Sequence, residues 1–334
     1  MRTRSLNDSW SGMIIGLRHL ATSAGLLVFI GCGGGVDQAQ TDAAPQFKAT
    51  KSCPADIPAS RTCGPNRDDD CCDSIQLPGG QFWGDYDGVT YTGKTWDVTV
   101  SPFYLDTYEI TVGRYRAFVE AYPTSKPKLG DGAHPKIPNS GWQADWPIAA
   151  TQQELRENAE TPVVAENFYT HEPGNNENRP IVEVSWYELF AFCAWDGGRL
   201  PTEAEWNFAA AGGDQQRVYA WSDPPQSTIL DHSYSTYNIA DIDARPARVG
   251  SYPKGRSRWG QFDLTGNVFE FVLDWYTAPL SPCVDCAQIM TGSLPVERGG
   301  SFDSPPEDLG VAFRQDVGVG GSVSVGARCA RDHK

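Results

Sequence analysis

Residues 180–213 read PIVEVSWYELFAFCAWDGGRLPTEAEWNFAAAGG, and this stretch predicts two short helices joined by a tight turn. Ser185 precedes Glu188 by three residues and Thr202 precedes Glu205 by three, so each pair is expected to form a capping box. Behind the first cap, apolar side chains recur with the spacing of one helical face. They are Trp186, Leu189, Phe190, Cys193 and Ala194. A glycine pair follows each helical pattern, and glycine readily takes the left-handed conformation that ends a helix.

The chain of 334 residues is acidic, with a formal net charge of -15. That charge disfavours nucleic acid and anionic membrane surfaces as partners, because both repel a negative protein. It suits an exported soluble protein or one that gathers divalent cations, although a solvated acidic surface is the simpler interpretation. The 34 glycines, 24 prolines and 11 tryptophans are typical of a loop-rich domain with aromatic anchors rather than of a helical bundle.

Residues 1–31 predict a lipoprotein signal peptide. Arginines precede an apolar run over residues 20–30, which is too short to span a bilayer as a stable helix. The run leads into Val-Phe-Ile-Gly-Cys, which resembles a bacterial lipobox with Cys32 as the lipidated residue. An ordinary signal peptide cut nearby is the alternative. Both alternatives export the mature chain. With the lipid anchor, its only attachment to a membrane, the chain would lie in the cell envelope, on the periplasmic face or the cell surface.

Composition divides the mature chain into three parts. Residues 32–52 are rich in Gly, Ala, Gln and Thr and predict a flexible tether. Residues 53–78 are dense in cysteine and Asp and predict a small disulfide-stapled cap on the main domain, which spans residues 79–334. In the main domain, Thr111 caps a helical pattern, whereas residues 123–179 have little periodicity and form either a binding surface or a packed insert.

The nine cysteines become eight, an even number, if Cys32 carries a lipid. An exported chain would pair them as disulfides. The eight are Cys53, Cys63, Cys71, Cys72, Cys193, Cys283, Cys286 and Cys329. The Cys-x-x-Cys pair formed by Cys283 and Cys286 suggests a redox pair, a zinc pair or a structural disulfide. No second pair and no histidine cluster has metal-ligand spacing, which favours the disulfide.

Five blocks of sequence carry a family resemblance. They are residues 103–118 (FYLDTYEITVGRYRAF), 197–206 (GGRLPTEAEW), 260–276 (including GNVFEF), 298–302 (RGGSF) and 326–331 (GARCAR). In this order they resemble the formylglycine-generating enzyme (sulfatase-modifying factor) family. The resemblance implies one loop-rich domain of mixed α/β (α+β) class, with the formylglycine-generating-enzyme fold and a C-type-lectin-like core. It also implies a disulfide between Cys193 and Cys329, and it leaves the other six cysteines with fifteen possible connectivities.

The resemblance implies a calcium site in the block after Gly260. Asp263 and Glu270 would supply carboxylates, and Gly266 and Val268 would supply main-chain carbonyls, which are the hard oxygen ligands that calcium prefers. From spacing alone, the same residues read as a turn with a capped strand. The family's second cation site is represented only by Asn238 and the carbonyl of Ile239. Asp241 or Asp243 would have to complete it.

Two residues decide whether the family's oxidase chemistry is expected. In the family, oxidation of a substrate cysteine to formylglycine uses two thiols that bind copper(I), a soft ion suited to thiolates. Counting from the Gly-Gly-Ser motif places Ser304 and Leu309 at the thiol positions, and residues 287–328 contain no cysteine. Phe269 stands where the family has Trp, while the pocket serine, Ser301, is retained. Copper is therefore not expected.

These patterns predict a non-oxidase member of the family. It would be an exported, lipid-anchored scaffold with a structural calcium ion that binds a peptide, glycan or protein partner in the groove beside Ser301. The alternative is a formylglycine-generating-type oxidase with other ligands, acting on a cysteine of a sulfatase-like substrate. A third hypothesis is that the loop with Asp303 and Ser304 supports a different reaction, such as hydrolysis. The sequence contains no zinc-hydrolase histidine motif, P-loop or dinucleotide fingerprint.

Overall fold

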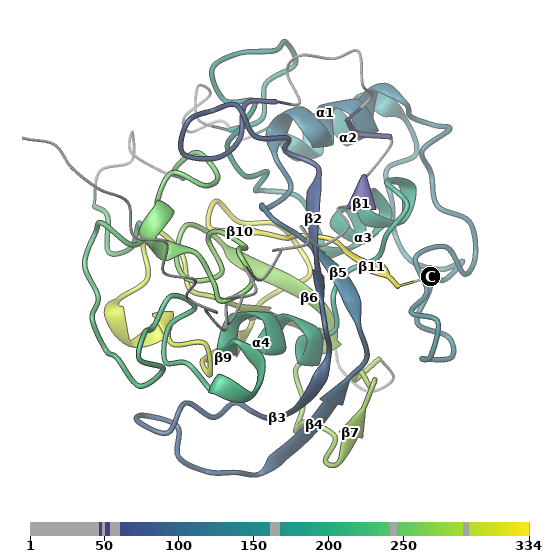
Figure 1. Cartoon of the computed structure of the whole chain (residues 1–334). Coiled ribbons are helices and arrows are strands. Elements are labelled where there is room, and N and C mark those ends of the chain that lie inside the picture. Colours follow the sequence, from purple (N-terminus) through teal and green to yellow (C-terminus); the bar gives the residue numbers. More distant parts are fainter. Residues whose placement is uncertain are drawn as a thin grey trace, which may run out of the picture. The chain divides into compact units, whose positions relative to one another are not determined.

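The computed structural model describes residues 47–48, 51–53, 61–160, 168–240, 246–289 and 294–333, which belong to one compact unit within residues 43–334. The predicted signal peptide, Cys32 and most of the predicted tether lie outside the described residues. Figure 1 shows the arrangement of the described elements.

Both helices expected from residues 180–213 are present. Helix α3 spans Trp186–Trp195 and helix α4 spans Glu203–Ala211. Each begins with a complete capping box, because the side chain of Ser185 or Thr202 accepts the third helical N–H and the facing Glu carboxylate accepts the cap N–H. Gly212 ends α4 in the left-handed conformation, with a φ of 66°.

The described residues contain two further α-helices and three short 3-10 helices. Helix α1 spans Val112–Glu120 and is capped by Thr111 as the sequence predicts. Helix α2 (Gln152–Ala159) lies inside the stretch that showed little periodicity, and the described remainder of that stretch is irregular. The 3-10 helices are Gly213–Gln215, Pro253–Gly255 and Pro306–Leu309. Within the described ranges, no helix combines the length and the apolar content that a membrane crossing requires.

The described strands form three small sheets. The first has the order β1-β2-β5-β11, with β1 at Phe47–Lys48, β2 at Asp73–Leu77, β5 at Phe103–Asp106 and β11 at Ala330–Asp332. The second has the order β10-β6-β8-β9, with β10 at Val325–Gly326, β6 at Phe269–Trp275, β8 at Pro295–Arg298 and β9 at Arg314–Asp316. The third has the order β3-β4-β7, with β3 at Gly80–Gly84, β4 at Trp96–Val100 and β7 at Cys283–Val284.

Strand β6 lies between the two main hydrophobic cores. Phe269, Phe271 and Leu273 point into the core that contains α1 and α3, whereas Val272 points into the core that contains α4, β3 and β4. This alternation is the normal geometry of a strand that is covered on both faces. The mixed α/β, loop-rich class expected from the sequence is therefore correct.

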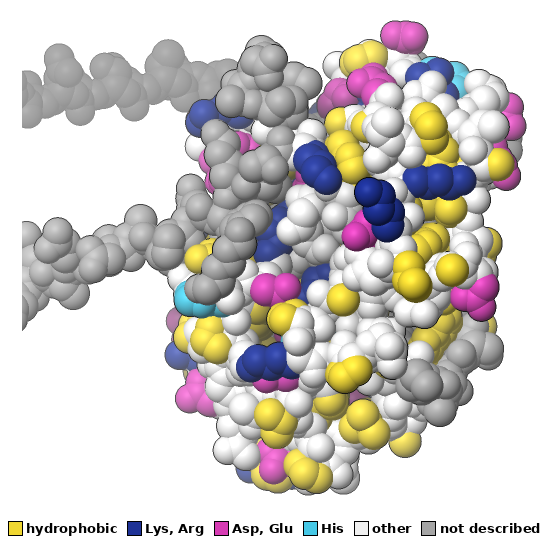
Figure 2. Space-filling model, turned by 90° about the vertical axis from the view of Figure 1, so that its right-hand side faces the viewer, with side chains coloured by type: hydrophobic (Ala, Val, Ile, Leu, Met, Phe, Trp, Pro, Cys, Tyr) yellow, Lys and Arg dark blue, Asp and Glu magenta, His cyan; other side chains and the backbone are white. Residues whose placement is uncertain are grey.

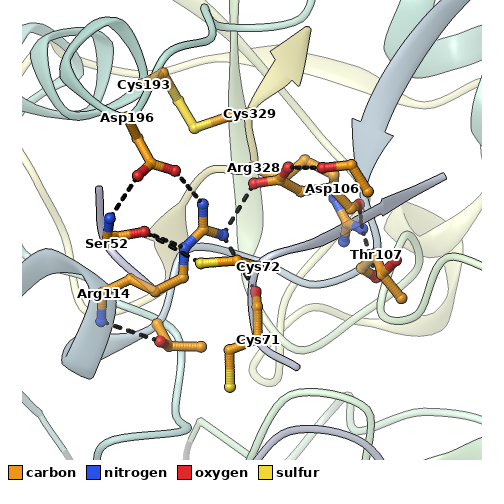
Figure 3. A network of polar contacts seen from close by, with 12 residues as sticks. Ser52, Cys71, Cys72, Asp106, Thr107, Arg114, Cys193, Asp196, Arg328 and Cys329 are labelled. Carbon is orange, nitrogen blue, oxygen red and sulfur yellow. Dashed lines mark hydrogen bonds and ion pairs between the residues drawn. A yellow bond between two sulfur atoms is a disulfide. The ribbon is translucent and has the colours of Figure 1, made fainter. Parts of the chain in front are cut away.

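A buried ionic network ties Ser52, at the end of the predicted tether, and Cys71, whose carbonyl accepts from Arg114, to the main domain (Figure 3). Arg114 forms ion pairs of 2.9 Å with both Asp106 and Asp196, and Arg331 pairs with the same two carboxylates. The Ser52 N–H donates to Asp196, and its hydroxyl accepts from Arg114. These side chains are almost completely buried, so removing one partner would leave an uncompensated charge in the interior.

All eight cysteines of the described residues are paired. The bridges are Cys53–Cys72, Cys63–Cys71, Cys193–Cys329 and Cys283–Cys286. The third is the bridge that the family resemblance implied, and the fourth is the structural disulfide that the spacing of Cys283 and Cys286 favoured. The first two belong to the N-terminal segment, where sequence alone left the pairing open.

Candidate functional site

The Gly-Gly-Ser turn follows β8 and takes a course that requires glycine. Gly299 and Gly300 have φ angles of 97° and 71°, in the region that side chains with a Cβ rarely occupy. A Cβ on Gly300 would also lie 2.6 Å from a methyl carbon of Leu309. The turn can therefore bend sharply enough to bury Ser301 beneath the loop that follows it.

Ser301 is the centre of a small hydroxyl cluster. Its Oγ donates to the Asp303 carboxylate at 2.5 Å and lies 3.1 Å from Ser304 Oγ. The Ser301 N–H donates to Ser304 Oγ at 3.0 Å, and the Ser304 N–H donates back to the Ser301 carbonyl at 3.1 Å. Ser301 and Ser304 are buried, whereas Asp303 is exposed. The three pocket residues named from the sequence are therefore in contact with one another.

Main-chain hydrogen bonds bring both predicted cation segments against this cluster. The Phe302 N–H donates to the Asn267 carbonyl at 2.7 Å, and the Ile239 N–H donates to the Phe302 carbonyl at 2.7 Å. The Asn238 N–H donates to the Ser304 carbonyl at 3.0 Å. The segments around residues 238 and 267 therefore flank the serine turn and fix its position through main-chain hydrogen bonds.

The two expected thiol positions hold no thiol. Ser304 presents a hydroxyl to Ser301, and Leu309 is a fully buried aliphatic side chain packed beside Gly300. Every cysteine in the described part of the chain is already in a disulfide. The described donors near Ser301 are hydroxyl, carboxylate and carbonyl oxygens, which are hard ligands, so this donor set does not fit copper(I).

Glu297 is a residue of this region that sequence reasoning missed. It is a buried side chain of β8 that accepts a hydrogen bond from the amide of Gln315 on β9, while its Oε2 has no partner among the described residues. Burial, with smaller contributions from the negative charges of Asp316 and Asp303, raises the pKa of Glu297 to about 7. The raised pKa of this glutamate results mainly from its burial, which no sequence motif predicts.

Two residues of the predicted calcium site, Asp263 and Glu270, belong to a buried acidic cluster. The Asp263 carboxylate accepts the Gly250 N–H at 2.6 Å, and burial raises its pKa to about 6. Glu270 forms a bidentate ion pair with Arg328, with a shortest distance of 2.6 Å, and also accepts from the Trp206 indole at 2.8 Å. Asp263 is therefore held by one main-chain donor, whereas Glu270 is neutralised by an arginine.

A third acid, Glu109, adds negative charge to the same cluster. It is fully buried, its Oε2 accepts from the Asn267 amide at 2.7 Å, and its Oε1 has no partner among the described residues. Burial raises the pKa of Glu109 well above its ordinary value, with further contributions from Asp263 and Glu270. One positive charge, on the guanidinium of Arg328, faces three carboxyl groups. A bound hard cation would compensate the remaining negative charge when these groups are ionised.

Comparison with known proteins identifies the family. The model of the sulfatase-modifying factor enzyme 1-like domain matches residues 59–333. The chain belongs to this family. The formylglycine-generating enzyme of Streptomyces coelicolor is 34% identical over 289 residues, which cover 77% of this chain and 88% of that protein. The mouse protein named inactive C-alpha-formylglycine-generating enzyme 2 is 30% identical over 287 residues, which cover 73% of this chain and 86% of that protein.

Two solved structures share the fold of this sulfatase-modifying factor domain. PvdO from Pseudomonas aeruginosa aligns with a TM-score of 0.58 and 21% identity over 87% of this chain and 98% of that chain. Treponema denticola variable protein 1 aligns with a TM-score of 0.51 and 19% identity over 78% of this chain and 95% of that chain. At these identities the likeness concerns the fold alone.

Within the sulfatase-modifying factor fold, the residues around Ser301 do not fit copper(I), whereas the acidic residues around Asp263 offer the oxygen ligands that calcium prefers. Calcium would be held by the carboxylates of Asp263 and Glu270 and the carbonyls of Gly266 and Val268, where it would offset buried negative charge. At the second predicted site, Asn238 has a left-handed φ of 48° and Ile239 follows it, but the acids proposed to complete the site fall outside the described residues.

Proposed function

We propose that this chain is an exported, lipid-anchored member of the sulfatase-modifying factor family that does not oxidise cysteine. Instead it binds a peptide, glycan or protein partner in the groove beside Ser301, on a framework stabilised by calcium. The observation that carries the proposal is the replacement of both thiols by Ser304 and Leu309, together with the pairing of all described cysteines. A related mouse protein whose name calls it inactive is consistent with such a role.

The competing function is a formylglycine-generating-type oxidase, as the name of the Streptomyces coelicolor relative suggests. It would need copper(I) ligands other than the residues at the two thiol positions. The fold similarity does not favour either function, because one fold supports different chemistry when the residues of the site change.

A cysteine-peptide assay separates the two functions. The mature protein is incubated, with and without copper(I), with a peptide that contains the sulfatase-type Cys-x-Pro-x-Arg motif, and mass spectrometry follows the cysteine. The proposal expects no conversion beside an active formylglycine-generating enzyme as the positive control. Copper-dependent conversion would contradict it and establish the oxidase.

The proposed location rests on the lipobox-like stretch at residues 28–32 and is supported by four disulfides, which form in oxidising compartments. Cell fractionation of the wild type and a Cys32→Ser variant tests the anchor. We expect the wild type in the membrane fraction and the variant in the soluble extracytoplasmic fraction. An unchanged distribution would refute lipidation at Cys32.

A further inference from the structure

A cavity of about 470 Å³ lies at the far end of β6 from the Ser301 turn. The turn contacts Asn267, just before β6, whereas the cavity is lined by Leu273 and Trp275 at its end. A strand rises about 3.3 Å per residue, so the two places are about 20 Å apart along β6. The volume lies in the range of about 300–1,000 Å³ that is usual for small-ligand sites.

Three indole rings, together with Leu273 and Ile289, form the apolar part of this cavity, which we call the indole cavity. Trp186 lies between the other two, with ring centroids 5.1 Å from Trp146 and 5.3 Å from Trp275. Its indole N–H donates to the Val272 carbonyl at 2.8 Å, so the polar atom of this ring is satisfied inside the protein. Trp146 and Trp275 are half-buried and expose part of their rings. The surface offered to a ligand is therefore mixed, with the exposed parts of the Trp146 and Trp275 rings beside polar groups.

Four polar residues complete the lining: Asn139, Ser140, Gln143 and Asp145. Ser140 is buried and its hydroxyl donates to the Ile137 carbonyl at 2.7 Å, whereas Gln143 and Asp145 offer mainly acceptors. The Gln143 amide nitrogen donates to the carbonyls of Asn139 and Gly141 at 3.1 and 2.6 Å, and no described donor reaches its oxygen. The Asp145 carboxylate is exposed and makes no ion pair with a described residue. Asn139 is exposed and has a left-handed φ of 61°. A ligand that donates hydrogen bonds from several positions would satisfy these oxygens.

The combination of indole faces and acceptor oxygens specifies the ligand chemistry. A pyranose ring presents C–H bonds on one face, which pack on an indole, and O–H donors around its rim, which bind amide and carboxylate oxygens. We propose that the indole cavity binds a neutral saccharide. This site is separate from the groove beside Ser301, and neither proposal depends on the other.

The exposed surface supports recognition in a cavity rather than on a flat patch. Figure 2 shows one face of the molecule, on which hydrophobic side chains are scattered singly or in small groups among basic, acidic and other polar ones. Few large hydrophobic side chains are strongly exposed among the described residues, and the most exposed are Leu129 at 72%, Val284 at 67% and Ile229 at 59%. None of these three lines the indole cavity.

Tryptophan fluorescence of the full mature chain, kept in a detergent without a sugar headgroup, tests the proposal. Maltose, cellobiose, lactose and chitobiose are titrated separately, each up to about 10 mM. We expect a saturable change with at least one of them. Trp146→Ala should weaken that binding by about ten-fold or more, and Trp146→Phe should retain part of it. Gln143→Ala, at the solvent-facing rim, should weaken binding without affecting the indole packing.

Trp83→Ala is the matched control, because Trp83 is a half-buried tryptophan on β3 that does not line the cavity. It should bind as the wild type does. A saturable change with none of the four sugars would overturn the proposal. So would a saturable response to tetramethylammonium chloride without a response to sugars, because the cavity would then be a cation site. Equal weakening by Trp83→Ala and Trp146→Ala would also overturn it.

Discussion

Replacing Glu297 by Gln is expected to change how the stability of the domain depends on pH. Burial raises the pKa of Glu297 from an ordinary value of 4.5 to about 7. Between these values the folded state keeps a proton that the unfolded chain releases, so the free energy of unfolding falls as pH rises through this window and is level above it. One pKa unit corresponds to about 1.36 kcal/mol, so this group alone lowers the stability by about 3 kcal/mol.

The Glu297→Gln variant cannot titrate at this position. Its free energy of unfolding, relative to the wild type, should therefore increase by up to about 3 kcal/mol between about pH 4.5 and pH 8. Urea denaturation followed by tryptophan fluorescence at each pH measures this difference. Glu307→Gln is the control, because Glu307 is exposed in the 3-10 helix Pro306–Leu309 and should leave the curve unchanged. Parallel pH curves for the wild type and Glu297→Gln would refute the reasoning.

Three further predictions concern the Cys193–Cys329 disulfide, the two thiol positions and the predicted calcium site at Asp263. Replacing Cys193 and Cys329 together by Ala should lower the free energy of unfolding by about 5 kcal/mol in urea denaturation, because the bridge spans 136 residues; a loss below about 1 kcal/mol would contradict the chain-entropy argument. The double variant Ser304→Cys with Leu309→Cys should compete with bicinchoninic acid for copper(I), whereas equal competition by the wild type would show that other ligands exist. Chelation with EGTA should lower the Tm of the wild type but not of Asp263→Ala, since calcium at one hundred times its Kd adds about 2.7 kcal/mol; equal shifts would place the cation elsewhere.

The helix ends could be predicted from sequence because the deciding contacts are local. Ser185 and Thr202 each bind a glutamate three residues later, and both capping boxes form as expected. The sheet pairings could not be predicted in the same way. Strand β5 lies between β2 and β11, so Leu105 faces Ile75 on one side and Ala330 on the other. An alternating pattern shows that a segment is a strand but does not say which distant strand it pairs with.

The charged interior was also beyond sequence reasoning. Glu203 stands in the first turn of α4, where a glutamate is commonly solvated and favourable to the helix dipole. The structure instead buries it between Arg298, at 2.6 Å, and Arg314, at 2.7 Å. A charged residue looks the same in sequence whether it is solvated or paired inside, so neither this ion pair nor the unpaired oxygen of Glu297 could be anticipated.

The way the serine turn is held explains why this fold can exist without the thiols. Gly299 accepts from the Gly266 N–H at 2.7 Å, and Phe302 is bonded through its N–H and its carbonyl to neighbouring segments. These bonds are between main-chain atoms, so they do not depend on which side chains follow the turn. Ser304 and Leu309 are therefore compatible with this framework, and the side chains at these positions, rather than the fold, decide whether copper(I) ligands are present.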